Sequence, residues 1–153
     1  MKKLYIVIIS IIIIVGLIII FGLYNENTIP SVSGPTELTQ DDNRNFALHV
    51  SSQSFAIDPV DIKIYIDNKL AVDRDFYVGT QHTYKSFRYS LSKGQHNIKI
   101  ESKKGGATLE ENFVIIDKHS GVVEYWYYPE THYDPTPKHF TFWFGEDKPL
   151  LID

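Results

Sequence analysis

The sequence predicts an antiparallel β-sandwich of about eight strands behind a single N-terminal transmembrane helix. An uncharged apolar run occupies residues 4–23, and it is long enough to cross a bilayer. After Asn45 the pattern changes, and apolar and polar residues alternate in short segments that turn residues separate. The 153-residue chain therefore has length for one domain of ordinary size after the apolar run.

The apolar run is expected to be a helix, because every backbone polar group in hydrocarbon must be hydrogen-bonded within the segment. Lys2 and Lys3 precede the run, whereas Asn25 and Glu26 follow it. The positive-inside rule then leaves a cytoplasmic stub of residues 1–3 and a membrane anchor over residues 4–24. We expect a single-pass protein of the cell membrane with its C-terminal domain outside the cytoplasm.

A cleaved signal peptide is the alternative to an anchor. The apolar part of a signal peptide has about 7 to 15 residues and ends at a small-residue cleavage site. The run here is longer, and the small residues of 31–33 lie well beyond its end. We therefore expect an uncleaved anchor.

Composition restricts the partners of the exported part. Thirteen of the fifteen Lys and Arg residues and all nineteen Asp and Glu residues follow the anchor, which leaves a net charge of −6. This charge does not suit binding to nucleic acid or to an anionic membrane surface. The chain has no Cys, so no disulfide supports the domain, and a bacterial envelope is a more natural setting than a disulfide-rich animal secretome.

Residues 25–43 are expected to form a tether before a domain that covers residues 44–153. The segment is polar, contains Pro30, Gly34 and Pro35, and has no apolar period. Within it, Thr36 to Gln40 could instead pair as a first edge strand, and the sequence leaves both alternatives open.

The first strong strand signal is the segment Val60 to Ile66, in which every second residue is apolar. A three-residue loop over residues 67–69 would oppose Ile66 to Leu70 and Ile64 to Val72, which keeps apolar residues on one face. A strand from Asn45 to Gln53 precedes this hairpin.

The same reasoning predicts two further reversals. A loop over residues 92–95 would join strands 84–91 and 96–102 as a hairpin, and a turn over residues 103–106 would oppose Ile100 to Leu109. Glu111 then falls on the apolar face, which a bulge near Glu110 and Glu111 or an edge strand would explain, and we expect the bulge.

Two aromatic strands complete the domain. A turn over residues 118–121 leads into Val122–Tyr128, and a Pro-rich connection leads into His139–Phe144. Short strands at this turn-punctuated spacing favour a two-layer antiparallel sandwich over a fold with helices.

The segments VDIKIYIDNKL (60–70) and YSLSKGQHNIKIE (89–101) resemble a pattern of small bacterial Ig-like and PEGA-like envelope modules. Asn68 stands where these modules usually have Gly, and the aromatic segment after Gly121 has no counterpart. The resemblance implies an Ig-like sandwich that serves as a non-catalytic spacer or binding domain.

No motif indicates catalysis, a cofactor or a metal site. Neighbours on a strand such as Glu110 and Glu111 point to opposite faces and cannot act as a paired acid and base. His132, Asp134 and His139 combine potential zinc ligands, but their spacing matches no standard site. We therefore expect a protein that is not an enzyme and that holds no cofactor.

The aromatic segments raise a binding hypothesis. Phe140, Phe142 and Phe144 share one strand face, which leaves Trp143 on the other face. An exposed ring row could anchor a protein partner or stack on the sugar rings of a cell-wall glycan. The candidate binding surface is Tyr125, Tyr127, Tyr133 and Trp143.

The competing interpretation is that the Pro-rich connection or the tether covers both faces of these strands. Under this interpretation Trp143 is protected from solvent, which is the result that we expect. The protein acts through its surface on another envelope protein in the first functional hypothesis, and it binds cell-wall glycan in the alternative.

Overall fold

The computed structural model describes residues 36–41, 44–80 and 83–146. The predicted stub, the anchor and most of the predicted tether lie outside these residues. In the described part of the chain, no helix is long and apolar enough to span a membrane.

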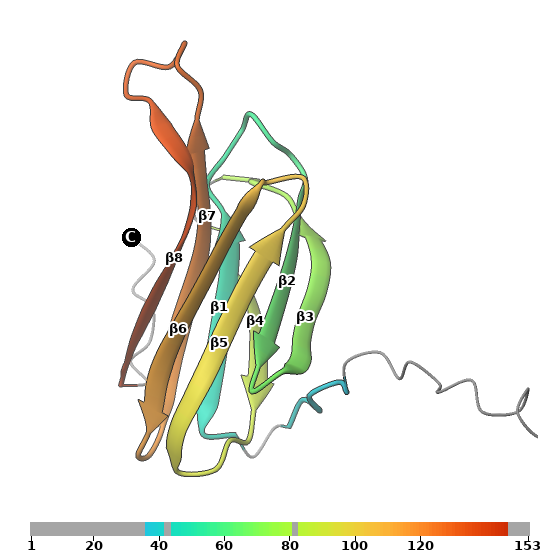
Figure 1. Cartoon of the computed structure of the whole chain (residues 1–153), viewed down its shortest axis with the longest axis vertical. Helices are drawn as coiled ribbons and strands as arrows, with labels where there is room; N and C mark the ends of the chain where they lie inside the picture. The colour runs from blue at the N-terminus through green and yellow to red at the C-terminus, as the bar shows by residue number, and fades with distance from the viewer. Residues whose placement is uncertain (1–35, 42–43, 81–82, 147–153) are drawn as a thin grey trace, which may run out of the picture. The chain divides into compact units, whose positions relative to one another are not determined.

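Within these described residues, eight strands form two four-stranded sheets that pack face to face as a β-sandwich (Figure 1). The first sheet has the order β4-β1-β7-β8 and the second has the order β3-β2-β5-β6. The strands are β1 (Phe46–Ser52), β2 (Val60–Ile66), β3 (Lys69–Phe76), β4 (Lys85–Tyr89), β5 (Gly94–Ser102), β6 (Ala107–Ile115), β7 (His119–Tyr128) and β8 (Thr136–Glu146). The predicted number of strands and the sandwich are confirmed.

One pair of strands departs from the expected antiparallel arrangement. β1 pairs with β7 in parallel, from Phe46 opposite His119 to Ser52 opposite Tyr125. Parallel neighbours cannot be joined by a tight hairpin, so the pairing connects segments from opposite ends of the domain. Pattern reasoning along the chain offers no local signal for such a contact.

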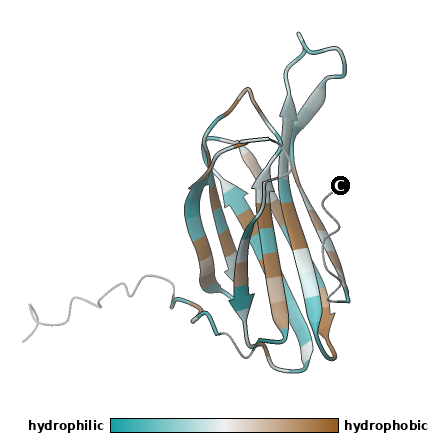
Figure 2. Cartoon of the chain, turned by 180° about the vertical axis from the view of Figure 1, so that it is seen from behind, coloured by the Kyte–Doolittle hydropathy of each residue, from teal (hydrophilic) through white to brown (hydrophobic). Residues whose placement is uncertain are grey.

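The core lies between the two sheets, and alternation along each strand selects its residues. Val60, Ile62, Ile64 and Ile66 of β2 are all fully buried, whereas Lys63 between them is partly exposed. Figure 2 shows the most apolar residues concentrated on the strands. The predicted face of β2 is confirmed.

The predicted loop between β2 and β3 is wrong by one residue. Asp67 and Asn68 alone form the turn, and both have positive φ, at 50° and 62°. Two residues with positive φ match the twist of a hairpin, whereas the three-residue alternative does not need both. A register shift after Ile64 then restores the predicted pairing of Ile64 with Val72, while Ile66 opposes Lys69.

The predicted hairpin of β4 and β5 does not form. β4 pairs with β1, and β5 pairs with β2 and β6, so residues 90–93 cross from one sheet to the other. The apolar residues of β4 and β5 face the same core from opposite sheets. Their alternation therefore fits a hairpin as well as it fits two strands of a sandwich. Tyr89 shows this: it is fully buried, and its hydroxyl donates a 2.6 Å hydrogen bond to the Ala71 carbonyl in the opposite sheet.

The expected bulge near Glu110 and Glu111 is also absent, because β5 and β6 pair without interruption from Gly94 opposite Ile115 to Ser102 opposite Ala107. The turn over 103–106 and the pairing of Ile100 with Leu109 are confirmed. Glu111 is exposed because β6 is an edge strand, where an acidic side chain on the inner side can reach water.

The start of β7 is earlier than expected. β7 begins at His119, and the reversal lies at residues 116–118, so the predicted turn over 118–121 is wrong. Gly121 lies within this strand, and a Cβ atom there would lie 2.9 and 2.8 Å from the Phe46 and Phe142 rings. The position therefore requires glycine for close packing against rings, whereas the sequence alone suggests a turn.

Residues 36–40 pair with the edges of both sheets. The Leu38 amide donates to the Leu70 carbonyl of β3, and Gln40 forms a bridge with Tyr89 of β4. Thr36 to Gln40 therefore contacts one edge of each sheet through isolated bridges, and the structure assigns no strand to this segment.

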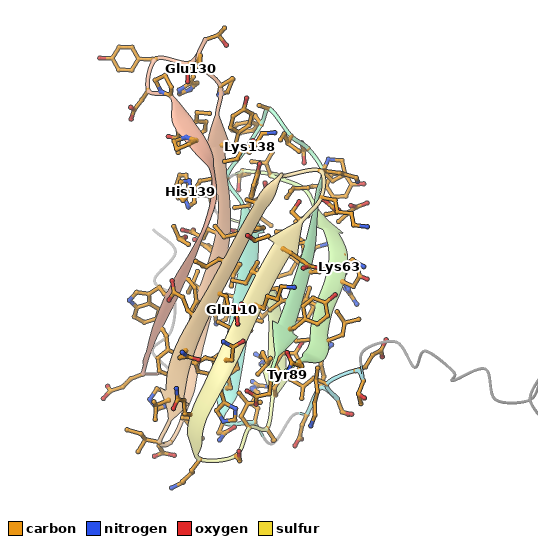
Figure 3. All side chains as sticks on the ribbon, viewed as in Figure 1. Lys63, Tyr89, Glu110, Glu130, Lys138 and His139 are labelled. Atoms are coloured by element: carbon orange, nitrogen blue, oxygen red, sulfur yellow. The ribbon has the colours of Figure 1, made fainter. Side chains whose placement is uncertain are left out.

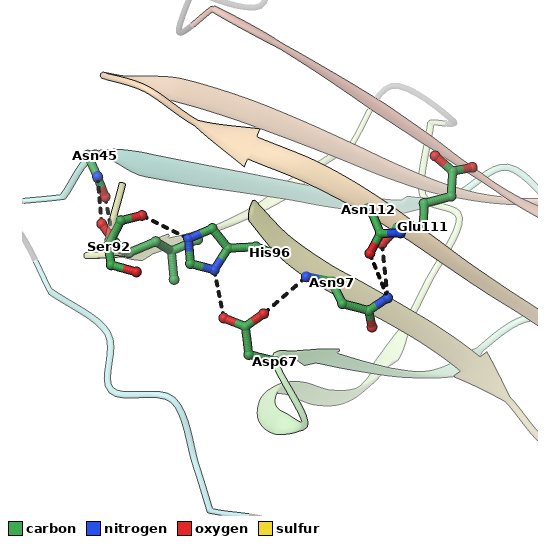
Figure 4. A network of polar contacts seen from close by, with 8 residues as sticks. Asn45, Asp67, Ser92, His96, Asn97, Glu111 and Asn112 are labelled. Atoms are coloured by element: carbon green, nitrogen blue, oxygen red, sulfur yellow. Dashed lines mark hydrogen bonds and ion pairs between the residues drawn. The ribbon is translucent and has the colours of Figure 1, made fainter. Parts of the chain in front are cut away.

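A buried histidine ties the sheet crossing to the turn between β2 and β3 (Figure 4). The Nδ1 atom of His96 lies 2.6 Å from an Asp67 carboxylate oxygen, and its Nε2 atom lies 2.8 Å from the Ser92 carbonyl oxygen. The Asn97 amide donates to the other Asp67 oxygen at 3.0 Å. The two contacts to Asp67 join residues that are about 30 positions apart in the sequence, and the side chain of His96 is only 5% exposed.

Candidate aromatic binding surface

The pairing of β7 with β8 decides which of their aromatic rings face solvent. Val123 and Tyr125 of β7 are fully buried, so the alternate residues Val122, Glu124 and Trp126 lie on the outer face. Val122 opposes Trp143 of β8, and Trp126 opposes His139. The outer face of this ribbon therefore collects rings from both strands.

We call the rings on this outer face the aromatic strip. The Trp126 and Tyr128 rings meet edge to face, with centroids 6.2 Å apart and an interplanar angle of 78°. The Tyr128 and His132 rings stack, with centroids 4.6 Å apart and an angle of 17°. His139 lies on the outer side of β8 (Figure 3). The strip consists of Trp126, Tyr128, His132, His139 and Trp143.

Trp143 is the most accessible apolar ring of the strip. Its side chain is 55% exposed, so the expectation that the Pro-rich connection seals it is wrong. The indole folds over Gly145, where an added Cβ atom would lie 2.5 Å from the ring. One side of the indole thus covers a glycine of the edge strand. The remaining ring surface is available to a partner.

The other residues of the predicted surface do not join this strip. Tyr125 is fully buried, and its hydroxyl donates a 2.8 Å hydrogen bond to the Gly105 carbonyl. Tyr127 is half-buried, and the Lys138 ammonium lies 5.2 Å from its ring centroid. Tyr133 is fully exposed on the connection between β7 and β8. Only Trp143 of the four predicted residues belongs to the strip.

Pattern reasoning missed Trp126 and Tyr128, although the sequence carries a signal for them. Val123 has the same parity as Tyr125, and the charged Glu124 has the same parity as Trp126. A carboxylate is far more costly to bury than a valine, so Glu124 marks the outer face of β7. Because Tyr125 has the opposite parity to Glu124, the same argument places Tyr125 in the core.

Glu124 is held in a polar cluster beside the strip. Tyr84 donates to its Oε1 atom at 2.6 Å, and the Gln53 side-chain amide donates to the same atom at 3.3 Å. Burial, followed by this bond to a carboxylate, raises the pKa of Tyr84 to about 12. Tyr84 therefore stays protonated as a hydrogen-bond donor, and the cluster orders the surface without forming an acid and base pair.

The polar groups near the strip do not form a metal site. The Nδ1 atom of His132 lies 3.2 Å from the backbone nitrogen of Asp134, and Nδ1 of His139 lies 2.7 Å from the Pro137 carbonyl oxygen. Within residues 36–41, 44–80 and 83–146, no group of three or more His, Cys, Asp or Glu side chains is placed to hold an ion. The Nδ1 atoms of both histidines are thus engaged by backbone atoms two residues away.

Comparison with known proteins finds no family model and no curated relative that matches this chain.

Proposed function

We propose that this protein is a non-catalytic interaction module of the bacterial cell envelope, anchored in the membrane and exposed outside the cytoplasm. The apolar run at residues 4–23 and the lysines before it support the anchor and its orientation. The resemblance of residues 60–70 and 89–101 to Ig-like and PEGA-like envelope modules supports a binding role.

The observation that carries the proposal is the exposed aromatic strip, and above all Trp143. Tryptophan is over-represented among the residues that dominate binding energy at protein interfaces. An indole that is 55% exposed on an ordered strand keeps more than half of its surface available to bury against a partner.

The geometry of the strip favours a protein partner over a flat sugar surface. Sugar rings stack best on aromatic rings that lie in one plane, yet Trp126 and Tyr128 are inclined at 78°. A protein side chain can insert between rings at such an angle. The exposed indole of Trp143 is the one feature that keeps glycan binding as the alternative function.

The strip extends along the β7 and β8 ribbon, and Trp143, opposite Val122, lies near the start of β7. Residues 36–40 pair with Leu70 and Tyr89, which lie at the end of the sandwich where β7 begins. β7 and β8 run from there to the opposite end, where residues 129–135 connect them (Figure 1). The rings at Trp126, Tyr128 and His132 therefore lie at the end that points away from the entry of the tether.

Photochemical crosslinking in intact cells tests the proposal. A photoreactive amino acid replaces Thr141, which lies beside Trp143 on the outer face of β8, in the full chain, and a matched control places it at Val114, which is 48% exposed on the outer side of β6. We expect a covalent adduct with one envelope protein from position 141 and not from position 114. An adduct that a cell-wall hydrolase removes would favour the glycan alternative, and equal adducts from both positions would contradict a role for the strip.

A further inference from the structure

We propose that β8 pairs antiparallel with β8 of a second copy of this chain, so that two sandwiches share one continuous eight-stranded sheet. The inference begins from the edges of the two sheets. An edge strand exposes unpaired backbone donors and acceptors, and proteins protect such edges with charges, short strands or covering segments.

Three of the four edges carry such protection. Residues 36–38 pair with β3, which also presents three consecutive charged residues, 73–75. β4 is only five residues long and carries Lys85 and Arg88. β6 presents Glu110 and Glu111 in its centre. Pairing with another strand at any of these three edges would bring charged side chains into close contact.

The β8 edge differs from the other three. β8 is eleven residues long, and among the described residues it pairs only with β7. Residues 139–145 carry no Asp, Glu, Lys or Arg, and five of these seven residues are aromatic or His. Pro137 and Lys138 protect only the first part of the strand.

The charges of β8 identify a second β8 as the strand that fits this edge. Lys138 lies near the start and Glu146 at the end, and both are exposed. In an antiparallel pair centred on Phe142, the lysine of each strand lies opposite the glutamate of the other, which gives two complementary charge pairs. Thr141 of one copy then lies opposite Trp143 of the other, on the outer face.

The pairing also has a consequence for the aromatic strip. A two-fold axis perpendicular to a shared sheet keeps the outer faces of both copies on the same side. The two strips therefore meet across the β8 pair and form one surface. The pairing itself rests on β8 alone and does not depend on the proposed function.

A charge exchange tests the register, with full chains in detergent that carry one of two affinity tags. Wild-type chains should co-purify across the two tags. Lys138→Glu alone opposes glutamate to glutamate at both ends of the pair, and Glu146→Lys alone opposes lysine to lysine. For each single variant paired with itself we expect association about tenfold weaker than wild type, because two exposed ion pairs change sign.

The mixture of the two variants provides the decisive arm. Chains with Lys138→Glu and chains with Glu146→Lys complement each other at both ends, so their association should return to the wild-type level. Each variant is its own control for folding, since the same chain associates in one combination and not in the other. Glu110→Lys on β6 should leave association unchanged.

Two results would overturn the pairing. Failure of wild-type chains to co-purify would mean that the β8 edge does not bind a second copy. Equal recovery of all combinations would place the contact elsewhere, in the predicted anchor or in residues 147–153.

Discussion

At the scale of single residues, His96 shows how the fold constrains a protonation state. Each of its ring nitrogens faces an oxygen that can only accept a hydrogen bond, on Asp67 and on Ser92. A neutral imidazole has one N–H group and satisfies one of these acceptors, whereas the imidazolium satisfies both. Burial alone lowers the pKa of His96, but the bonds to Ser92 and Asp67 outweigh it, and the pKa is raised.

The histidine predicts a pH dependence of stability. A group whose pKa is higher in the folded state stabilises the fold fully below its unfolded pKa, and it loses this contribution as pH rises through the folded value. Burial raises the pKa of Asp67, but bonds from Asn97 and His96 lower it overall, so its contribution is lost only in more acidic solution. The two contributions are therefore complete together between about pH 4 and pH 6.5.

We expect the free energy of unfolding, measured with denaturant, to fall as pH rises from about 6 to 8. His96→Gln should remove this slope, because Gln does not titrate. Asp67→Asn should remove or reverse it, because the burial that lowers the histidine pKa is then no longer offset by a carboxylate. An identical slope in wild type and His96→Gln would show that another group is responsible.

At the scale of elements, β2 holds the centre of the core by strict alternation. Ile64 is fully buried, and Lys63 beside it is partly exposed in an ion pair with Asp73 at 2.8 Å. We expect Ile64→Asp to unfold the domain, because it places an unpaired carboxylate in the apolar core. Lys63→Gln should leave the free energy of unfolding nearly unchanged, because it removes only an exposed ion pair. Denaturant melts of the two variants compare them, and similar losses would refute the assignment of faces.

The elements also show what the sequence could and could not predict. The faces of β2, and the β5 and β6 pairing through Ile100 and Leu109, follow from local alternation and a short turn, and both were predictable. The separation of β4 from β5 was not predictable, because alternation defines the side that faces the core and not the strand that lies beside it. For the same reason Trp143 was assigned to the outer face correctly, while its solvent exposure depended on the path of a connection with no pattern of its own.

At the scale of the whole molecule, the described domain combines a closed core with an aromatic strip on the outer face of β7 and β8. Residues 36–40 cover the edges of β3 and β4, and the crossing at residues 90–93 joins the sheets near the same end. The outer face of β7 and β8 carries the aromatic strip along the ribbon to the opposite end. Trp126, Tyr128 and His132 lie at the end away from residues 36–40, whereas Trp143, opposite Val122, lies toward the end where β7 begins.

The central claim is that Trp143 serves binding and not folding, and Trp143→Ala tests it most directly. The measurement combines the melting temperature of the full chain with the yield of the partner adduct from a photoreactive residue at Thr141. We expect a stability loss of about 1 kcal/mol or less, since the ring is 55% exposed, together with a loss of about 2 kcal/mol or more in binding. Tyr133→Ala, on a fully exposed ring outside the strip, should retain the adduct. A destabilisation of about 3 to 5 kcal/mol would instead identify Trp143 as a packing residue, and an unchanged adduct yield would contradict its role in binding.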